Sequence, residues 1–270
     1  MTRIEECILY RDFEQEEVLN DVTTMIDDWH AGTLDESDKG RFYRCLNQLV
    51  EMANAYGFWG NLWHAYLTFL LVNKENAFST SCEIVGKVEG SINQMARHDF
   101  VRFKELFDFD IRVFDEAFGS KDCEIICAYQ NTDMSKKLFN RRVCDRIMEL
   151  SGKLSTAGDV EEFMELMIQF YQDFGVGKLG LHKAFRIDHV GEQVEIIPIT
   201  NIAHVHLDDL VGYEIAKKKL IENTEAFVQG RKANNCLLFG DAGTGKSSSI
   251  KGILNEYYDQ GLRIIEVYKH

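Results

Sequence analysis

Apolar residues in the first part of the chain recur with the spacing of amphipathic helices. They return every three or four positions, which places them on one face of a helix. The helices predicted from this pattern are Glu14–Trp29, Arg41–Tyr56, Phe58–Val72, Asn76–Arg97, Phe100–Phe118, Ser135–Leu150 and Asp159–Phe174. Phe58–Val72 is apolar on nearly every side, as a central helix should be, and Glu124–Tyr129 carries a weak strand signal. We therefore predict a helical domain over residues 1–174, whose topology the pattern leaves open.

The pattern changes after Phe174 to short runs rich in β-branched residues. Lys183–Asp188 and Gln193–Ile199 predict a β-hairpin, with Pro198 near its end, where an edge strand tolerates proline. A Gly-rich joint precedes the hairpin. Together they form a predicted linker region over residues 175–207.

From residue 208 onward the pattern predicts alternating helices and strands. Leu210–Gln229 is a predicted helix, and the apolar run Asn235–Phe239 is predicted to be a short buried strand. Ser248–Tyr258 is a second predicted helix, and Leu262–Tyr268 a second strand. The order strand, loop, helix, strand is the arrangement that a phosphate-binding loop requires.

The loop within this arrangement carries the Walker A pattern G-x-x-x-x-G-K-S. Glycines let a phosphate chain approach the backbone, whose N–H groups, with the positive end of the next helix, bind the phosphate oxygens. Lys246 can reach the β- and γ-phosphates, and the Ser247 hydroxyl can bind Mg²⁺. The predicted nucleotide contacts are Gly240, Asp241, Ala242, Gly243, Thr244, Gly245, Lys246, Ser247 and Ser248, with ATP and Mg²⁺ as cofactors. The pattern identifies no catalytic residue.

Charge divides the chain at nearly the same place as the hydrophobic pattern. The formal net charge is −14, and the nine basic and nine acidic residues after position 207 cancel, so the first 207 residues carry all of it. An acidic surface repels phosphate backbones, which argues against direct nucleic-acid binding. The same step in charge supports a domain boundary near residue 208.

The cysteines and the most apolar segment indicate in which cellular compartment the protein is expected. The seven cysteines are scattered and follow no signal peptide, which favours reduced thiols in a cytoplasmic protein. Phe58–Val72 is too short to span a bilayer, so we expect no membrane insertion.

Three weaker motifs are interpreted as structural features and not as functional sites. Gly175–Gly180 matches the dinucleotide pattern G-x-G-x-x-G, but it follows a helix and precedes a strand, so a flexible joint is favoured. Ile111–Glu116 resembles a Walker B strand only loosely and is interpreted as a solvated helix edge. His204 and His206 would face one side of an extended segment, but no third metal ligand lies at a useful spacing.

Residues around the loop carry a resemblance to a known family. They are Leu207-Asp208-Asp209-Leu210-Val211-Gly212-Tyr213-Glu214, Asn223-Thr224 and Ala233-Asn234-Asn235-Cys236-Leu237-Leu238-Phe239-Gly240. These segments resemble the start of an AAA+ ATPase module. The chain is similar to a bacterial family of uncharacterised, predicted AAA-type ATP-binding proteins, in which a long helical region precedes the module. The similarity is specific from about Gly175 onward, and it implies that Val211 and Gly212 contact the adenine base.

The resemblance also implies that parts of the module are missing. In the AAA+ topology the strand before the loop is flanked by strands that would fall after His270, so Asn235–Phe239 would be left as an exposed edge. The Walker B acids, sensor residues and arginine finger, which stabilise phosphoryl transfer, are likewise absent from the sequence. We therefore expect a mainly α-helical N-terminal region followed by the beginning of an α/β P-loop domain over residues 208–270, truncated after its second strand.

Three functions remain open at this point. The favoured one is an AAA-type ATP-binding protein that hydrolyses ATP only in a complete form, as a homo-oligomer acting on a protein client. A second is another P-loop class, a GTPase or small-molecule kinase, although the guanine-reading motif N-K-x-D does not occur. A third is a non-enzymatic interaction protein whose loop is vestigial.

Overall fold

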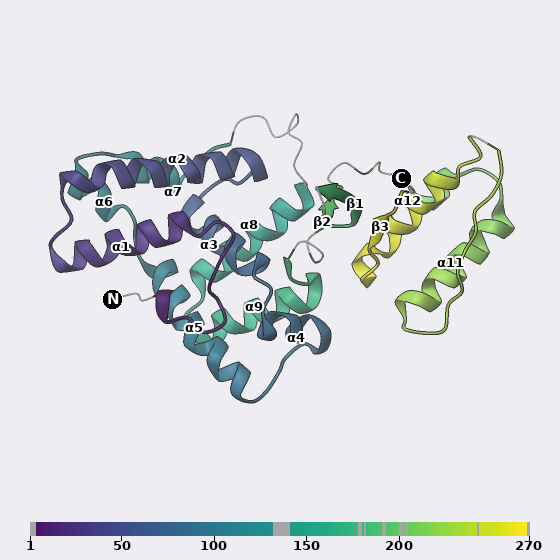
Figure 1. Ribbon diagram of the computed structural model, residues 1–270, viewed down its shortest axis with the longest axis horizontal. Helices are drawn as coiled ribbons and strands as arrows, with labels where there is room; N and C mark the ends of the chain where they lie inside the picture. Colours follow the sequence, from purple (N-terminus) through teal and green to yellow (C-terminus); the bar gives the residue numbers. More distant parts are fainter. Residues whose placement is uncertain are drawn as a thin grey trace. The chain divides into compact units, whose positions relative to one another are not determined.

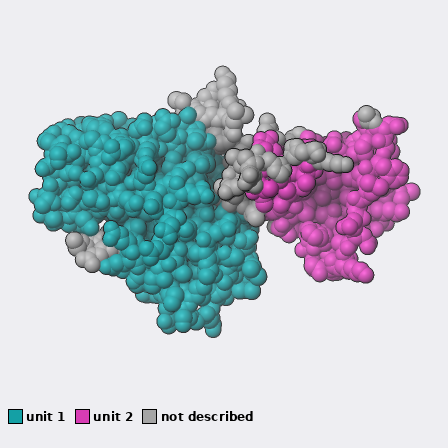
Figure 2. All heavy atoms as spheres, in the orientation of Figure 1, with its two compact units in different colours: residues 1–181 teal, residues 182–270 magenta. Residues whose placement is uncertain are grey.

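The computed structural model describes most of the chain. The described residues are 4–131, 141–177, 180, 182–190, 193–199, 202, 205–241 and 243–268. The chain divides into two compact units, residues 1–181 and residues 182–270 (Figure 2). Each unit has its own hydrophobic core, and we describe the two separately.

Unit 1 is built from helices (Figure 1). Its α-helices are α1 (Glu17–Ala31), α2 (Lys39–Tyr56), α3 (Leu62–Asn73), α4 (Ala77–Val85), α5 (Ser91–Asp108), α6 (Val113–Phe118), α7 (Asp122–Cys127), α8 (Arg141–Thr156) and α9 (Val160–Phe174). In α3, nine of the twelve residues are buried, which confirms the prediction of a central helix that is apolar all round. Trp63 in this helix is fully buried, and its indole N–H donates to the backbone oxygen of Leu106 at 3.1 Å.

The predicted helix boundaries between residues 76 and 118 are wrong. The predicted helix Asn76–Arg97 is interrupted after Val85, and α5 runs without a break through the predicted boundary near residue 100. Phe100–Phe118 likewise splits between α5 and α6. A short turn can leave the hydrophobic period in phase on either side of it, so periodicity alone does not reveal such a break.

A buried carboxylate fastens the N-terminal segment to unit 1. Asp99 on α5 is fully buried, and its oxygens accept the backbone N–H groups of Ile8, Leu9 and Tyr10 at 2.7–3.0 Å. His98 Nδ1 lies 2.9 Å from the same carboxylate. Because buried backbone donors must be paired, this one side chain substitutes for the strand or helix that would otherwise satisfy them.

A second buried carboxylate corrects the interpretation of Ile111–Glu116. Asp115 in this segment is buried and not a solvated helix edge. It accepts the backbone N–H groups of Cys123 and Glu124 at 3.0 and 3.1 Å, and so caps the start of α7. The weak strand signal at Glu124–Tyr129 is also wrong, because α7 continues through Cys127 and a single bridge joins Tyr129 to Gly60.

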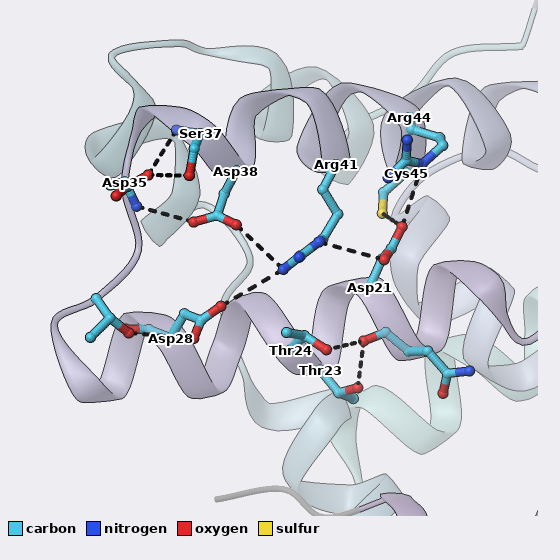
Figure 3. Close-up of polar contacts among 12 residues, drawn as sticks. Asp21, Thr23, Thr24, Asp28, Asp35, Ser37, Asp38, Arg41, Arg44 and Cys45 are labelled. Carbon is cyan, nitrogen blue, oxygen red and sulfur yellow. Dashed lines mark hydrogen bonds and ion pairs between the residues drawn. The ribbon is translucent and has the colours of Figure 1, made fainter.

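Ion pairs connect α1 with α2 at the surface of unit 1. The Arg41 guanidinium lies 3.6 Å from the carboxylate of Asp21, 3.7 Å from that of Asp28 and 3.3 Å from that of Asp38 (Figure 3). Arg44 pairs with the other oxygen of Asp21 at 3.6 Å. These groups are partly exposed, so each pair contributes about 1 kcal/mol or less.

Unit 2 combines a small mixed sheet with two helices. Strands β1 (Ala184–Val190) and β2 (Gln193–Pro198) are antiparallel, which confirms the predicted hairpin. Strand β3 (Ile264–Glu266) lies within the predicted strand Leu262–Tyr268 and pairs in parallel with β1, giving the order β2-β1-β3. The chain is thus mainly helical with a small three-stranded sheet near its C-terminal end.

The two helices of unit 2 enclose its core. They are α11 (Glu214–Val228), shorter at its start than the predicted Leu210–Gln229, and α12 (Lys246–Tyr257). The buried residues that form this core are Leu207, Leu220, Ile253, Tyr257 and Leu262. The Tyr257 hydroxyl donates to the Glu225 carboxylate at 3.1 Å and links α12 to α11. Partial burial, together with that carboxylate, raises the pKa of Tyr257.

The prediction of a buried strand at Asn235–Phe239 is wrong. These residues belong to no strand, and the side chains of Leu237 and Phe239 are 84% and 86% exposed. A strand is stable only when neighbouring strands pair with its backbone, and β3 pairs with β1 and not with this segment.

The described helices include none that could cross a lipid bilayer, because each is too short or too polar.

Replacing Asp99 by Asn is expected to destabilise unit 1 by about 3 kcal/mol, because the amide has one acceptor oxygen and turns a donor toward backbone N–H groups. Urea unfolding followed by tryptophan fluorescence measures this, since Trp29, Trp59 and Trp63 all lie in unit 1. The control Glu161→Gln removes an exposed partner of Arg97 and should cost less than about 1 kcal/mol. Equal effects of the two changes would contradict the anchoring role of Asp99.

Candidate functional site

The Walker A loop runs directly into the first residue of α12. Gly245 is the N-cap of this helix and Lys246 its first residue. Gly245 has φ = 79°, a left-handed conformation that strongly favours glycine. The first N–H groups of a helix have no acceptor within it, and they form the positive end of its dipole. The structure therefore places the predicted anion-binding backbone at the start of a twelve-residue helix.

Lys246 folds back over the loop. Its ammonium donates to the backbone oxygens of Gly240 and Asp241 at 2.9 and 2.6 Å, and to the Thr244 hydroxyl at 3.3 Å. The Thr244 hydroxyl donates in turn to the Asp241 oxygen at 2.8 Å. We call the oxygens of Gly240, Asp241 and Thr244 that face Lys246 the oxygen cage.

Gly240 fits the cage because it has no side chain. Its φ of 143° is rare for other residues, and a Cβ at this position would come within 3.2 Å of the Thr244 hydroxyl. A larger residue would therefore push the hydroxyl away from Asp241 and Lys246. The glycine at the start of the motif is explained by this close approach.

The residue before the predicted base-contacting pair lies near the end of the loop. A Cβ added to Gly245 would be 3.9 Å from the Leu210 side chain, and Leu210 directly precedes Val211 and Gly212. The Lys217 ammonium donates to the Leu210 backbone oxygen at 2.7 Å and fixes this segment to α11. Leu210, which precedes the predicted base-contacting residues, thus lies near the end of the loop in unit 2.

A pocket beside this segment was not predicted. Tyr213 adopts φ = 57°, a left-handed conformation that is uncommon for a residue other than glycine. A pocket of about 530 Å³ lies at the start of α11, lined by Tyr213, Glu214, Ile215, Ala216 and Lys219. Val211 next to it is 94% exposed. The sequence signal that could have indicated this feature is the Gly212-Tyr213 pair immediately before a helix.

Asn223 on α11 holds the chain that leads to the loop. Its side-chain amide donates to the Asn234 oxygen and accepts the Asn234 N–H, both at 2.8 Å. The same amide nitrogen lies 3.2 Å from the Cys236 sulfur. Sequence reasoning noted Asn223 only as part of a resemblance. The structure shows that it aligns the backbone before Asn235.

The remaining predicted site residues differ in their exposure. Ser247 is exposed, Ser248 is half-buried and Gly243 is exposed, whereas Ala242 lies outside the described residues. The described part of the chain contains no cluster of three metal-binding side chains of the His, Cys, Asp or Glu type. In this site Mg²⁺ would bind through Ser247 and the nucleotide phosphates.

The described residues of the His204/His206 and Gly175–Gly180 motifs make contacts elsewhere. His206 donates its backbone N–H to the Asp209 carboxylate at 2.8 Å, and His204 lies outside the described residues. Gly175 is the C-cap of α9, but Gly175, Val176, Gly177 and Gly180 are buried and the Val176 N–H donates to the Glu83 carboxylate at 3.3 Å. The described part of this segment is therefore packed in unit 1, and the interpretation as a flexible joint is wrong. Lys178 and Leu179 within it also lie outside the described residues.

A comparison with protein-family models gives a match that covers unit 2. A family model described as "Protein of unknown function (DUF815)" matches residues 180–270. No curated protein and no solved structure matches the chain. The matched region begins close to Gly175, where the resemblance to an uncharacterised family was predicted to become specific. That part of the prediction is confirmed for the C-terminal third of the chain, while the assignment of this family to the AAA type remains a prediction.

The exposure of Asn235–Phe239 leads to a prediction about thiol reactivity. Cys236 is the exposed thiol among the seven cysteines, and burial raises the pKa of Cys7, Cys45 and Cys144 to about 12. A disulfide reagent should therefore modify one thiol of the native protein faster than the others, by on the order of a hundredfold or more. Cys236→Ser should remove the fast phase and Cys127→Ser should leave it. A native protein without a fast phase would mean that Cys236 is covered.

Proposed function

We propose that unit 2 binds ATP with Mg²⁺, as the beginning of an AAA-type nucleotide-binding module. The observation that supports this most is the position of Lys246, the first residue of α12, with its ammonium beside the backbone of the Walker A loop. A phosphate group placed at this helix start would meet free helix N–H groups and a lysine within one residue of each other. A glycine-rich turn alone does not bring these groups together.

The base-binding part of the proposal rests on the position of Leu210, whose side chain lies 3.9 Å from where a Cβ on Gly245 would be. Val211 and Gly212 follow Leu210 in the chain and precede Tyr213, which lines the pocket at the start of α11. A largely apolar pocket suits the flat face of a purine. The proposal names adenine because of the family resemblance, and competition between ATP and GTP tests that choice.

Hydrolysis is a separate part of the proposal. Phosphoryl transfer to water needs acidic residues that hold Mg²⁺ and a group that orients the attacking water. The Walker A loop supplies binding and positioning only, so we propose ATP hydrolysis for a form that also carries the Walker B acids. In that form hydrolysis would drive the remodelling or regulation of a protein partner of acidic unit 1, in a homo-oligomer.

Lys246→Ala tests the proposed site. Loss of the ammonium should weaken MgATP binding by about tenfold or more, because charge-assisted hydrogen bonds to phosphate are lost. Lys251→Ala is a matched control, because Lys251 is an exposed lysine on the same helix. Isothermal titration of the purified chain with MgATP, and with GTP as competitor, gives both affinities. Equal binding by the wild type and Lys246→Ala would exclude this site.

Ser247→Ala tests the metal contact within the same site. Binding of MgATP should weaken several-fold, whereas binding of ATP in excess EDTA should change little, since the hydroxyl is proposed to act through Mg²⁺. A wild-type chain that binds neither ATP nor GTP, yet captures a protein through residues 1–174, would favour the non-enzymatic interaction protein.

A further inference from the structure

The segment before α11 is a tight turn in an unusual backbone conformation. Gly212 and Tyr213 follow each other with φ of 87° and 57°, both left-handed, and this conformation is uncommon for a tyrosine. Val211 in the same turn is 94% exposed, so its side chain is not held by a hydrophobic core. Strained backbone of this kind persists where neighbouring groups hold it, and it is frequent where ligands are bound.

Lys217 on α11 holds both ends of this turn. Its ammonium donates to the Leu210 backbone oxygen at 2.7 Å, and its backbone N–H donates to the Tyr213 oxygen at 2.9 Å. The second bond is an ordinary helical bond, whereas the first reaches seven residues back along the chain. The Leu210 side chain packs against the core of unit 2. Val211 and Gly212 therefore lie between two residues that are both bonded to Lys217.

The surroundings of Lys217 differ from those of the next lysine. The Lys217 side chain is 14% exposed, and its ammonium also lies 2.9 Å from the Glu214 carboxylate. The Lys218 side chain is 78% exposed, and its ammonium lies 3.8 Å from the Glu222 carboxylate. Burying an ammonium is costly unless it is paired, so the bond to Leu210 is part of how Lys217 is accommodated. Lys218 provides the matched case of a solvated lysine on the same helix.

We propose that Lys217 is a positioning residue that holds the turn Leu210–Tyr213 in the conformation that receives the base of the nucleotide. This inference rests on the proposed nucleotide site. The Leu210 side chain lies 3.9 Å from where a Cβ on Gly245 would be, so the turn begins near the N-cap of α12. In this role Lys217 acts on the base through the backbone of the turn, whereas Lys246 acts on the phosphates.

These two roles predict a selective loss of affinity. A turn that is already held in place spares the nucleotide the entropy cost of ordering it, so a turn without this tether should bind the base more weakly. The phosphates would meet the same loop and the same helix start in either case. Loss of the Lys217 ammonium should therefore weaken binding of MgATP more than binding of magnesium tripolyphosphate, which has no base.

Lys217→Met tests the proposal, because it removes the ammonium and keeps a long side chain. Isothermal titration of the purified chain with MgATP and with magnesium tripolyphosphate gives both Kd values. Lys217→Met should raise the Kd for MgATP about three- to tenfold and change that for tripolyphosphate by less than about twofold. Lys218→Met removes the same charge from the exposed position and should match the wild type. Lys217→Arg keeps a charged donor and should recover part of the MgATP affinity.

Gly212→Ala tests the same turn without changing Lys217. A Cβ on Gly212 would meet no atom within 4 Å, so alanine strains the left-handed backbone without a clash. This variant should show the same selective loss for MgATP. Gly230→Ala is the matched control, because Gly230 has φ = 68°, is equally open and lies just beyond the end of α11. Its affinities should match those of the wild type.

The other outcomes overturn the proposal in different ways. An equal loss of both ligands in Lys217→Met would mean that Lys217 supports the phosphate loop or the whole of unit 2. Unchanged MgATP binding would mean that the turn needs no tether, and the same loss in Lys218→Met would mean that bulk charge matters. A wild type that binds MgATP but not tripolyphosphate would contradict the division into base and phosphate parts. The proposed function fails separately, if Lys246→Ala and the wild type bind both ligands equally, whatever Lys217→Met does.

Discussion

The Asp99 carboxylate accepts three backbone N–H groups inside unit 1, and the N-terminal segment depends on it for its place. The physical constraint is general: a buried backbone donor without an acceptor costs about 1–3 kcal/mol, more than most single contacts contribute. Segments that are neither helix nor strand can enter the core where a side chain, another backbone group or an ordered water meets this demand. Asp115 does the same for the buried Cys123 N–H at the start of α7, whereas Asn223 pairs an exposed N–H before the loop in unit 2.

The same constraint decides the form of unit 2. Strand β1 pairs with β2 on one side and with β3 on the other, so its backbone groups are satisfied within the sheet. The segment Asn235–Phe239 has the composition of a buried strand, but it belongs to no strand and its apolar side chains are exposed. Composition makes a strand possible, and pairing makes it stable.

Hydrogen-bond pairing also determines how the backbone of the candidate site is arranged. In the loop, Gly240 and Asp241 direct their carbonyl oxygens at the Lys246 ammonium, which satisfies both partners in a partly exposed turn. A nucleotide would offer the lysine a stronger acceptor and the loop N–H groups an anion. The Thr244 hydroxyl, which donates to the Asp241 oxygen at 2.8 Å, belongs to the same set of contacts.

The sequence by itself determined the local features: the helical period of α1, α2, α3 and α9, the hairpin of β1 and β2, and the glycine-rich loop that leads into α12. These depend on residues within a few positions of each other, so a pattern reveals them. The tertiary structure decided the break between α4 and α5, the roles of Asp99 and Asp115, the exposure of Asn235–Phe239 and the meeting of Leu210 with Gly245. Several of these depend on partners far along the chain, such as Ile8 and Asp99, which are 91 positions apart, and no local pattern specifies such a partner.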